Sequence, residues 1–177
     1  MPEDPSLYVP TLIGLNDFNV TKITEEDKQR GKMYLDQRRR TEFQKTTTDF
    51  KEYLKQLGIK VIIKNANEFT IPRISQLTLK TNQFNLTTKR YQEEDIRKFV
   101  EDQNKIVECA QIQDKFGDNG ITSVYIINKE NEQEWFIDTF LLSCRVIGRG
   151  VEEALLSQII KRAKMKRNLI MALKYTF

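Results

Sequence analysis

The chain contains, at residues 143–152, the stretch Ser143-Cys144-Arg145-Val146-Ile147-Gly148-Arg149-Gly150-Val151-Glu152. Two glycines follow the first arginine at the spacing Arg-x-x-Gly-x-Gly. An apolar run typical of a strand, 135–142, precedes the stretch, and a helix-like run, 151–166, follows it. Glycine permits a tight turn and close approach to a ligand, and the free N–H groups at a helix start attract anions. This order predicts a phosphate-binding loop or, in the simpler alternative, a tight turn between a strand and a helix.

Composition restricts the class of protein. The 177 residues, 39% hydrophobic and 31% charged, suffice for one core, or for one domain with an appendage. The net charge of +4 is a mild excess, and the basic stretches 38–40 and 161–167 lack interleaved aromatic residues, so no nucleic acid partner is expected. No apolar run reaches the roughly 20 residues that span a bilayer, and residues 1–5 lack a signal-peptide pattern. We therefore predict a cytoplasmic protein without a membrane partner.

The chain has no histidine and two cysteines, Cys109 and Cys144. The lack of histidine excludes Ser-His-Asp and Cys-His triads and histidine-based zinc sites within this chain, so no metal is expected. The two cysteines are expected to be free thiols. A general base would have to be Asp, Glu, Lys, Tyr or a water that they hold.

The hydrophobic periodicity changes along the chain, from about 3.6 residues to 2. The first part predicts helices and two short strands: helices from Thr24 to about 43, 48–57, 73–81 and 93–103, and strands 60–64 and 84–88. The second part predicts strands 106–114, 121–128 and 134–142, a helix 151–166 and a last strand 169–175. Short, turn-rich connections at 117–120 and 129–132 indicate antiparallel neighbours, and the strand–helix–strand order indicates a right-handed parallel crossover.

The expected fold is α/β (α+β): a mixed sheet with an antiparallel meander and one parallel crossover, preceded by a helical N-terminal segment. This order resembles the core of the GNAT acyltransferase fold. In that fold an Arg/Gln-x-x-Gly-x-Gly/Ala loop holds the pyrophosphate of coenzyme A. The resemblance implies that a pantetheine arm lies between the two splayed strands that flank the helix.

Three segments together resemble the C-terminal part of FkbH-like proteins: RISQLTLKTNQFNLTTKRY at 73–91, DKFGDNG at 114–120 and IDTFLLSCRVIGRGVE at 137–152. Residues 2–5 and 24–30 are similar to the junction between the two parts of those proteins. The resemblance implies a GNAT-like domain that follows a HAD-type phosphatase domain. It implies a role in loading a glyceryl group from 1,3-bisphosphoglycerate onto an acyl carrier protein, which feeds methoxymalonyl-type units for polyketides.

The chain departs from that family in two respects. The HAD nucleophile motif Asp-x-Asp-x-Thr is absent, and the sequence stops at Phe177, where a full GNAT fold would continue with a helix and two strands. We therefore expect residues 1–58 to be a helical junction after a missing HAD domain, and residues 59–177 to be a GNAT-like domain truncated at its C-terminus. No phosphatase activity is expected.

Candidate ligand-binding residues follow from the glycine stretch and the family resemblance. The phosphate of phosphopantetheine or coenzyme A is expected at Gly148 and Gly150, with Arg145 and Arg149 near it. Asn82 and Gln83 are expected to bond the acyl group or the pantetheine amides; in the alternative they cap a loop. No tightly bound cofactor is expected.

Two residues are candidates for catalysis. Cys144 is expected to be a covalent acyl acceptor, with a small core residue as the equal alternative. Asp138 is an acid in an apolar strand; it is a candidate base if it points inward, and an ordinary surface residue if it points outward. Two functions follow: an acyl-transfer domain that works on the arm of an acyl carrier protein, or a non-catalytic module that docks the carrier for the HAD phosphatase domain.

Overall fold

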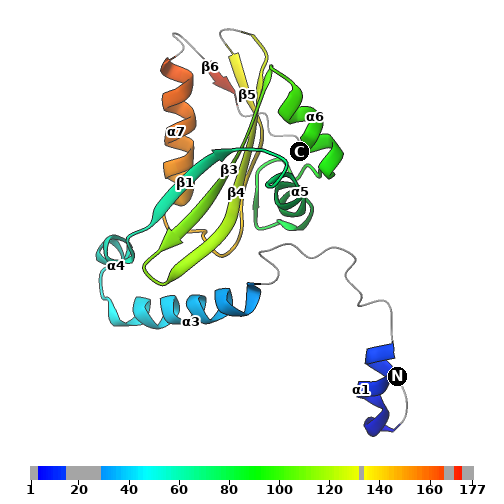
Figure 1. The fold of residues 1–177 in the computed structure, drawn as a ribbon. Coiled ribbons are helices and arrows are strands. Elements are labelled where there is room, and N and C mark those ends of the chain that lie inside the picture. Colours follow the sequence, from blue (N-terminus) through cyan, green and yellow to red (C-terminus); the bar gives the residue numbers. More distant parts are fainter. Residues whose placement is uncertain (1–3, 15–28, 132–133, 166–169, 173–177) are drawn as a thin grey trace.

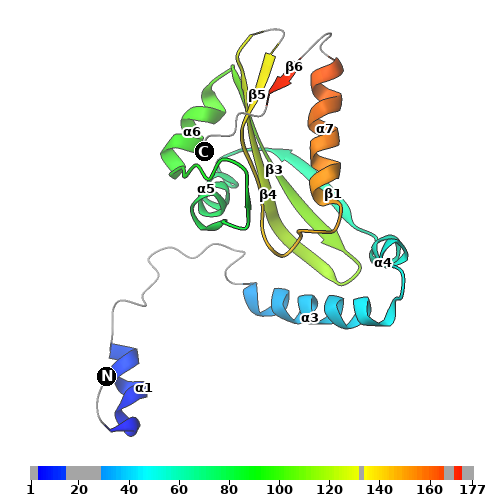
Figure 2. The ribbon, with the colours of Figure 1, turned by 180° about the vertical axis from the view of Figure 1, so that it is seen from behind.

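The computed structural model describes residues 4–14, 29–131, 134–165 and 170–172. The helices are a 3-10 turn Pro5–Leu7, α1 Tyr8–Gly14, α3 Arg30–Thr46, α4 Phe50–Leu57, α5 Ile71–Lys80, α6 Glu93–Glu101 and α7 Val151–Met165. The strands are β1 Lys60–Asn65, β2 Phe84–Asn85, β3 Lys105–Asp114, β4 Gly117–Lys129, β5 Glu134–Leu142 and β6 Ile170–Ala172. Figures 1 and 2 show α7 on one side of the sheet and α5 and α6 on the other. The predicted fold class is confirmed.

The helix ends follow local chemistry. Helix α4 is capped by the side chain of Asp49, which accepts from Lys51 N at 2.9 Å, so the helix begins at Phe50 and not at residue 48. It ends at Gly58, whose φ of 63° is left-handed. Helix α6 begins with a capping box between Gln92 and Asp95. The predicted start of the first long helix at Thr24 lies outside the described residues.

The central sheet is an antiparallel meander with the order β1-β3-β4-β5-β2. The predicted loop at 117–120 is wrong, because Asp114 pairs with Gly117 and only Lys115 and Phe116 form the turn. Residues 117–120 instead begin β4, and register shifts on both sides of Gln111 absorb the irregular pairing there. The side chain of Asn119 is buried and donates to Ile112 O at 3.3 Å, which satisfies its amide inside the sheet.

Two strands share the outer edge of β5. Strand β6 runs parallel to β5 and pairs with Glu134–Phe136, which confirms the predicted crossover through α7. Strand β2 pairs antiparallel with Leu141 and Leu142 at the other end of the same edge, and Leu86 N donates to Phe140 O at 3.1 Å. Among the residues that the structure describes, none pairs with the stretch 137–139 on this edge, between these two strands.

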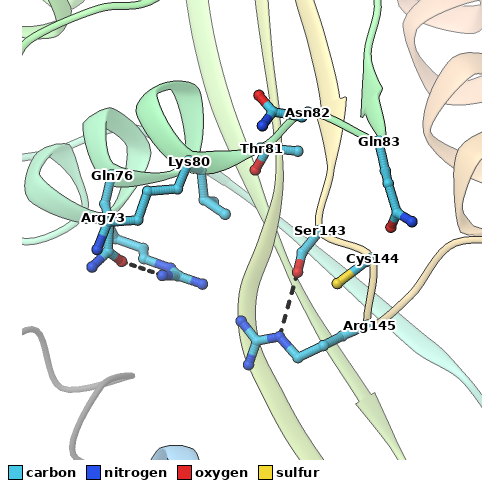
Figure 3. A pocket seen from close by; sticks show the side chains of 10 residues that line it. Arg73, Gln76, Lys80, Thr81, Asn82, Gln83, Ser143, Cys144 and Arg145 are labelled. Atoms are coloured by element: carbon cyan, nitrogen blue, oxygen red, sulfur yellow. Dashed lines mark hydrogen bonds between the residues drawn. The ribbon is translucent and has the colours of Figure 1, made fainter.

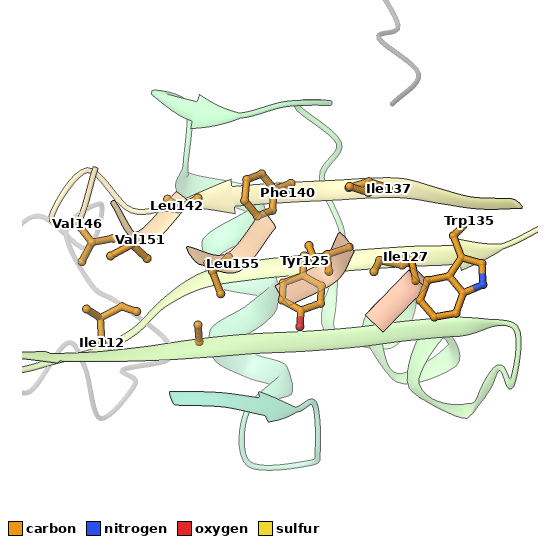
Figure 4. Packing of buried hydrophobic residues seen from close by; sticks show 13 residues of the cluster. Ile112, Tyr125, Ile127, Trp135, Ile137, Phe140, Leu142, Val146, Val151 and Leu155 are labelled. Atoms are coloured by element: carbon orange, nitrogen blue, oxygen red, sulfur yellow. The ribbon is translucent and has the colours of Figure 1, made fainter. Parts of the chain in front are cut away.

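Alternate residues of the strands fill two cores. Tyr125 and Ile127 face α7, where they pack with Phe140, Leu142 and Leu155 (Figure 4). Val124 and Ile126, which alternate with them on β4, face α5 and α6. They join a second cluster with Ile74, Ile96, Cys109 and Leu141. Burial of apolar surface on both faces of the sheet, at about 25 cal/mol per Å², is the main force that fixes this three-layer arrangement.

Helices α3 and α4 pack against one end of the sheet. The ring of Phe43 lies 5.7 Å from that of Phe116, centroid to centroid, and Lys115 Nζ lies 3.1 Å from the centre of the Phe43 ring. Arg40 forms an ion pair with Asp114 at 2.6 Å. The helices that the sequence assigned to a junction thus contact the β3–β4 turn, and the boundary between residues 58 and 59 stays a prediction. None of the described helices is long and apolar enough to cross a membrane.

Candidate functional site

The glycine loop connects β5 to α7. Gly148 and Gly150 have φ angles of 73° and 75°, which an L side chain rarely adopts, so the loop requires glycine at both positions. The N–H of Gly148 donates to Glu152 Oε1 at 3.0 Å, and Glu153 joins Glu152 in the first turn of α7. A negative charge near a helix start is favourable. The chain therefore places its own carboxylate where an anionic ligand of the loop was expected.

Arg149 is held inside the protein. Its side chain is only 9% exposed; Nη2 donates to Gln37 Oε1 at 2.9 Å, and Nη1 lies 3.6 Å from Asp114 Oδ2. Arg40 donates to both oxygens of the same carboxylate, at 2.6 and 2.9 Å. Burial is the main cause of a lowered pKa for Arg149. These contacts tie the glycine loop to α3 and to the end of β3.

A cleft of about 380 Å³ lies between one side of α5, the loop 81–83 and the segment 143–145. It brings together four residues that the sequence singled out: Asn82, Gln83, Cys144 and Arg145. Figure 3 shows them around one space, with the sulfur of Cys144 directed toward it. Arg73, Gln76 and Lys80 of α5 line the same cleft, which we call the basic cleft. Nothing in the sequence singled out these three residues beyond their place in the 73–91 segment.

The polar groups around the basic cleft are partly engaged with the protein. Arg73 Nε donates to Ile121 O at 3.1 Å, and Arg145 Nε lies 3.4 Å from Ser143 Oγ. Arg90 donates to Asn82 Oδ1 and to the carbonyl oxygens of Thr78 and Thr81 at the end of α5. The loop that presents Asn82 is therefore fixed by a cation at a helix C-terminus, where such a charge is favourable.

The two cysteines have opposite surroundings. Cys144 is exposed, so it is not the core residue that the sequence left open. It also borders a smaller pocket of about 190 Å³ on the α3 side, which Gly148 and Arg149 line. Cys109 is fully buried, and burial raises the pKa of its thiol to about 11. A reactive thiol of this chain is therefore Cys144.

Asp138 lies in the middle of β5 and points inward. It is the extra residue in the pairing with β4, because Ile126 pairs with Thr139 and the next residue, Ile127, pairs with Ile137. Its carboxylate is buried and accepts from Tyr91 OH at 2.7 Å and Lys89 Nζ at 2.5 Å. Burial and this bond raise the pKa of Tyr91 well above its usual value, so the phenol keeps its proton.

Tyr91 and Lys89 were not identified from the sequence as site residues. The available signal was their position at the end of the 73–91 segment, but nothing local to that segment indicates a partner on β5.

The structure also separates the two candidates for catalysis. Asp138 precedes the last residue of β5 by four positions, about 13 Å at 3.3 Å per residue, and Cys144 lies beyond that end. A single acyl group cannot contact both side chains.

A second groove, of about 280 Å³, runs between β5 and α7. Its walls are mainly apolar, and Glu152 and Glu153 stand at its edge; the lining residues are Phe84, Leu86, Ile137, Phe140, Glu152, Glu153 and Leu156. It borders the stretch 137–139 that neither β2 nor β6 pairs. Among the described residues, no three His, Cys, Asp or Glu side chains are grouped so as to hold a metal ion.

No family model and no curated protein sequence matches this chain. Solved structures do. The ribosomal-protein-S18-alanine N-acetyltransferase of Escherichia coli aligns at 11% identity and a TM-score of 0.50, over 64% of this chain and 66% of its own. The fold is GNAT-like. Similar values hold for Arabidopsis thaliana NAA60 in complex with a bisubstrate analogue (15% identity, TM-score 0.50, 64% of this chain, 74% of that chain).

A ribosomal-protein-alanine N-acetyltransferase from Brucella melitensis biovar Abortus 2308 also aligns, at 14% identity and a TM-score of 0.50, over 66% of this chain and 81% of its own. The alignment with the Escherichia coli enzyme spans just under two thirds of that enzyme. At these identities the likeness establishes the GNAT-like fold, and the chemistry has to be argued from the residues of this chain.

Proposed function

We propose that this chain is an acyl-transfer domain that works on an acyl group carried by the phosphopantetheine arm of an acyl carrier protein, as the resemblance to FkbH-like proteins implies. The observation that carries the proposal is an apolar groove beside the stretch 137–139 of β5, whose outer edge pairs with none of the described residues. An extended arm with amide groups can bond an open strand edge, and its methylene groups can fill an apolar groove.

The glycine loop favours an arm with a single phosphodiester over free coenzyme A. Arg149 is already paired with Asp114, and Glu152 occupies the N–H of Gly148. Glu153 adds a further negative charge at the edge of the groove. Like charges repel, and this cost rises with the number of phosphates on the ligand. The arm of a carrier protein therefore suits this loop better than coenzyme A, which carries several phosphate groups.

In this proposal the acyl carbonyl lies at the stretch 137–139, at the edge of the sheet beside Asp138. Tyr91 holds its proton and donates to Asp138, so these two side chains are positioned to bond an acyl hydroxyl. Cys144 can accept the acyl group only from a donor that enters the basic cleft. A glyceryl group remains the acyl group that the family resemblance suggests.

A non-catalytic docking role is the second candidate. The hydrogen bonds of Asp138 favour this role. Its carboxylate oxygens already accept from Lys89, Tyr91 and Thr139, so they are occupied and cannot readily act as a general base. In this role the chain would bind the phosphopantetheine arm and position its acyl group for a phosphatase domain.

The test compares holo and apo carrier protein, and 4′-phosphopantetheine with coenzyme A, by calorimetric titration. We expect the holo form to bind at least about tenfold more tightly than the apo form, because only it carries the arm. Equal affinity for both forms would refute the proposal.

Mass spectrometry of the carrier then separates the two roles. Asp138→Asn should abolish transfer and retain binding if the domain is catalytic, whereas a docking module transfers no acyl group in either form.

A further inference from the structure

The turn between β1 and α5 presents a phenylalanine to solvent on a fixed backbone. Phe69 is 95% exposed. The side chain of Asn67 accepts from the backbone N–H groups of Phe69 and Thr70, both at 3.1 Å, and this holds the turn. An apolar residue just before an N-cap often packs on the fourth residue of the helix, which here is Ile74. Ile74 is buried in the core and the exposed ring makes no such contact, so the ring is available to a partner.

The surface around Phe69 is acidic. Arg97 of α6 pairs with Glu68 at 3.0 Å and with Glu94 at 3.1 Å, which joins the turn to the helix. Val100 is also exposed and lies one helical turn beyond Arg97, on the same face of α6. Residue 68 and the segment 93–102 together contain six acidic and two basic residues. We call Phe69, Val100 and these acidic residues the α6 surface.

Helix α3 carries the opposite charge around a second pair of exposed apolar side chains. Tyr34 is 70% exposed and Leu35 is 61% exposed. Arg38 and Arg39 follow one turn later on the same helix, and both are exposed. The helix contains six basic and two acidic residues. We call Tyr34, Leu35, Arg38 and Arg39 the α3 surface.

The two surfaces lie on different parts of one molecule. Figures 1 and 2 show α3 across one end of the sheet, whereas α6 covers part of one face toward the other end. Arg40 fixes α3 to the end of β3 through Asp114, and the buried Ile96 fixes α6 to the core. A contact between the two surfaces therefore needs two molecules. Each surface has an apolar centre and the two have opposite charge, which is the complementarity that protein interfaces show.

We propose that the α6 surface binds the α3 surface of a second copy of this chain, so that the molecules associate head to tail. The ring of Phe69 packs against Tyr34 and Leu35, and the arginines of the α3 surface pair with acidic side chains and with the face of the ring. Such a contact is heterologous, because each associated pair still has one free surface of each kind. It is also small, so the association is weak and depends on protein concentration.

The test measures the mass of the full chain by sedimentation equilibrium over a range of protein concentrations. We expect the average mass to rise above that of the monomer at low salt and to fall back near 1 M salt, where charges are screened within about 3 Å. Phe69→Lys and Leu35→Glu each place a like charge in the contact, and each should weaken the association by more than about tenfold. Ile13→Lys, at an exposed position of α1, is the matched control and should leave the association unchanged.

A mixture of two variants distinguishes the head-to-tail contact from any other. Phe69→Lys retains the α3 surface, and Leu35→Glu retains the α6 surface. Each variant alone should be monomeric, whereas an equimolar mixture should form a species of twice the monomer mass and nothing larger. Both positions are exposed, so both variants should unfold in urea like the wild type. A wild-type chain that is monomeric at every concentration, an equal loss in Ile13→Lys, or a mixture that stays monomeric would each overturn the proposal.

Discussion

The two arginines of the glycine stretch lie four residues apart, yet they belong to opposite sides of the loop. Arg145 lines the open basic cleft beside Cys144. Arg149 is 9% exposed and lies against Asp114 and Gln37. The loop thus has an open side, which borders the cleft, and a closed side, whose arginine holds the loop to α3 and β3. The motif spacing alone treats both arginines as phosphate ligands.

The difference matters for the chemistry. A buried arginine that already shares a carboxylate adds little attraction for a phosphate, because its charge is compensated nearby. The Arg149 side therefore sets where the loop lies, whereas a ligand can approach the loop from the Arg145 side, which borders the cleft. Substitutions on the two sides should differ in kind: the closed side should affect folding, and the open side should affect ligands.

The largest effect is expected from Asp114→Ala on the closed side. It leaves Arg40, whose side chain is 2% exposed, and Arg149 as buried charges without their carboxylate. Removing one partner of a buried ion pair typically costs about 3–5 kcal/mol. Urea denaturation should show a loss of this size, whereas Arg145→Ala on the open side should cost less than about 1 kcal/mol. Similar losses for both variants would show that the two sides do not differ.

The sequence could predict the parts of this site that depend on neighbours in the chain. Alternation predicted β5, the glycine spacing predicted the loop, and the helix pattern predicted α7 to within one residue. It could not predict which arginine is buried, because the partner Gln37 is 112 residues away and both arginines have the same local surroundings. The partition follows from how α3 lies across the end of the sheet (Figure 1).

Two other predictions from the sequence were wrong because the structure there depends on contacts between residues that are distant in the chain. The stretch 117–120 has the composition of a turn, but pairing with β3 extends it into β4, since tertiary contacts override local preference. The segment 84–88 was predicted as a strand, and the structure retains only Phe84–Asn85, which pairs with the far end of β5. The inward direction of Asp138 could not be assigned, because the register shift that sets it lies between two strands.

The contrast between open and closed surroundings also separates the two thiols and predicts a pH effect. The pKa of Cys109 is raised from 9.0 to about 11, so the folded state keeps a proton that the unfolded state loses. The contribution of the Cys109 thiol to the free energy of unfolding is complete below pH 9 and is lost as the pH rises to 11. At about 1.4 kcal/mol per pKa unit the loss is on the order of 2–3 kcal/mol.

Urea denaturation at several pH values checks this effect. Cys109→Ala should lose less stability than the wild type between pH 9 and 11, and Cys144→Ala should follow the wild type. The raised pKa values of Tyr91 and Tyr125 act in the same direction, so the comparison has to be between variants. Parallel curves for Cys109→Ala and the wild type would contradict the assignment.

The smallest effect on folding, and the sharpest test of the loop, is expected from Glu152→Gln. The substitution keeps an oxygen that can accept from the N–H of Gly148, but removes a charge from the first turn of α7. Such a charge contributes about 0.3–1 kcal/mol, so stability should change little.

Ligand selectivity should change more, because a negative charge that repels phosphate is gone. Two unit charges 4 Å apart in water interact with about 1 kcal/mol, which corresponds to roughly a fivefold change in affinity. We therefore expect the affinity for coenzyme A to rise about fivefold and the affinity for 4′-phosphopantetheine to rise less. Glu101→Gln, on an exposed position of α6, matches the change in net charge and should alter neither affinity. If Glu152→Gln leaves the ratio of the two affinities unchanged in calorimetric titration, then the carboxylate at Gly148 is only a helix cap, and the loop does not distinguish a carrier-bound arm from coenzyme A.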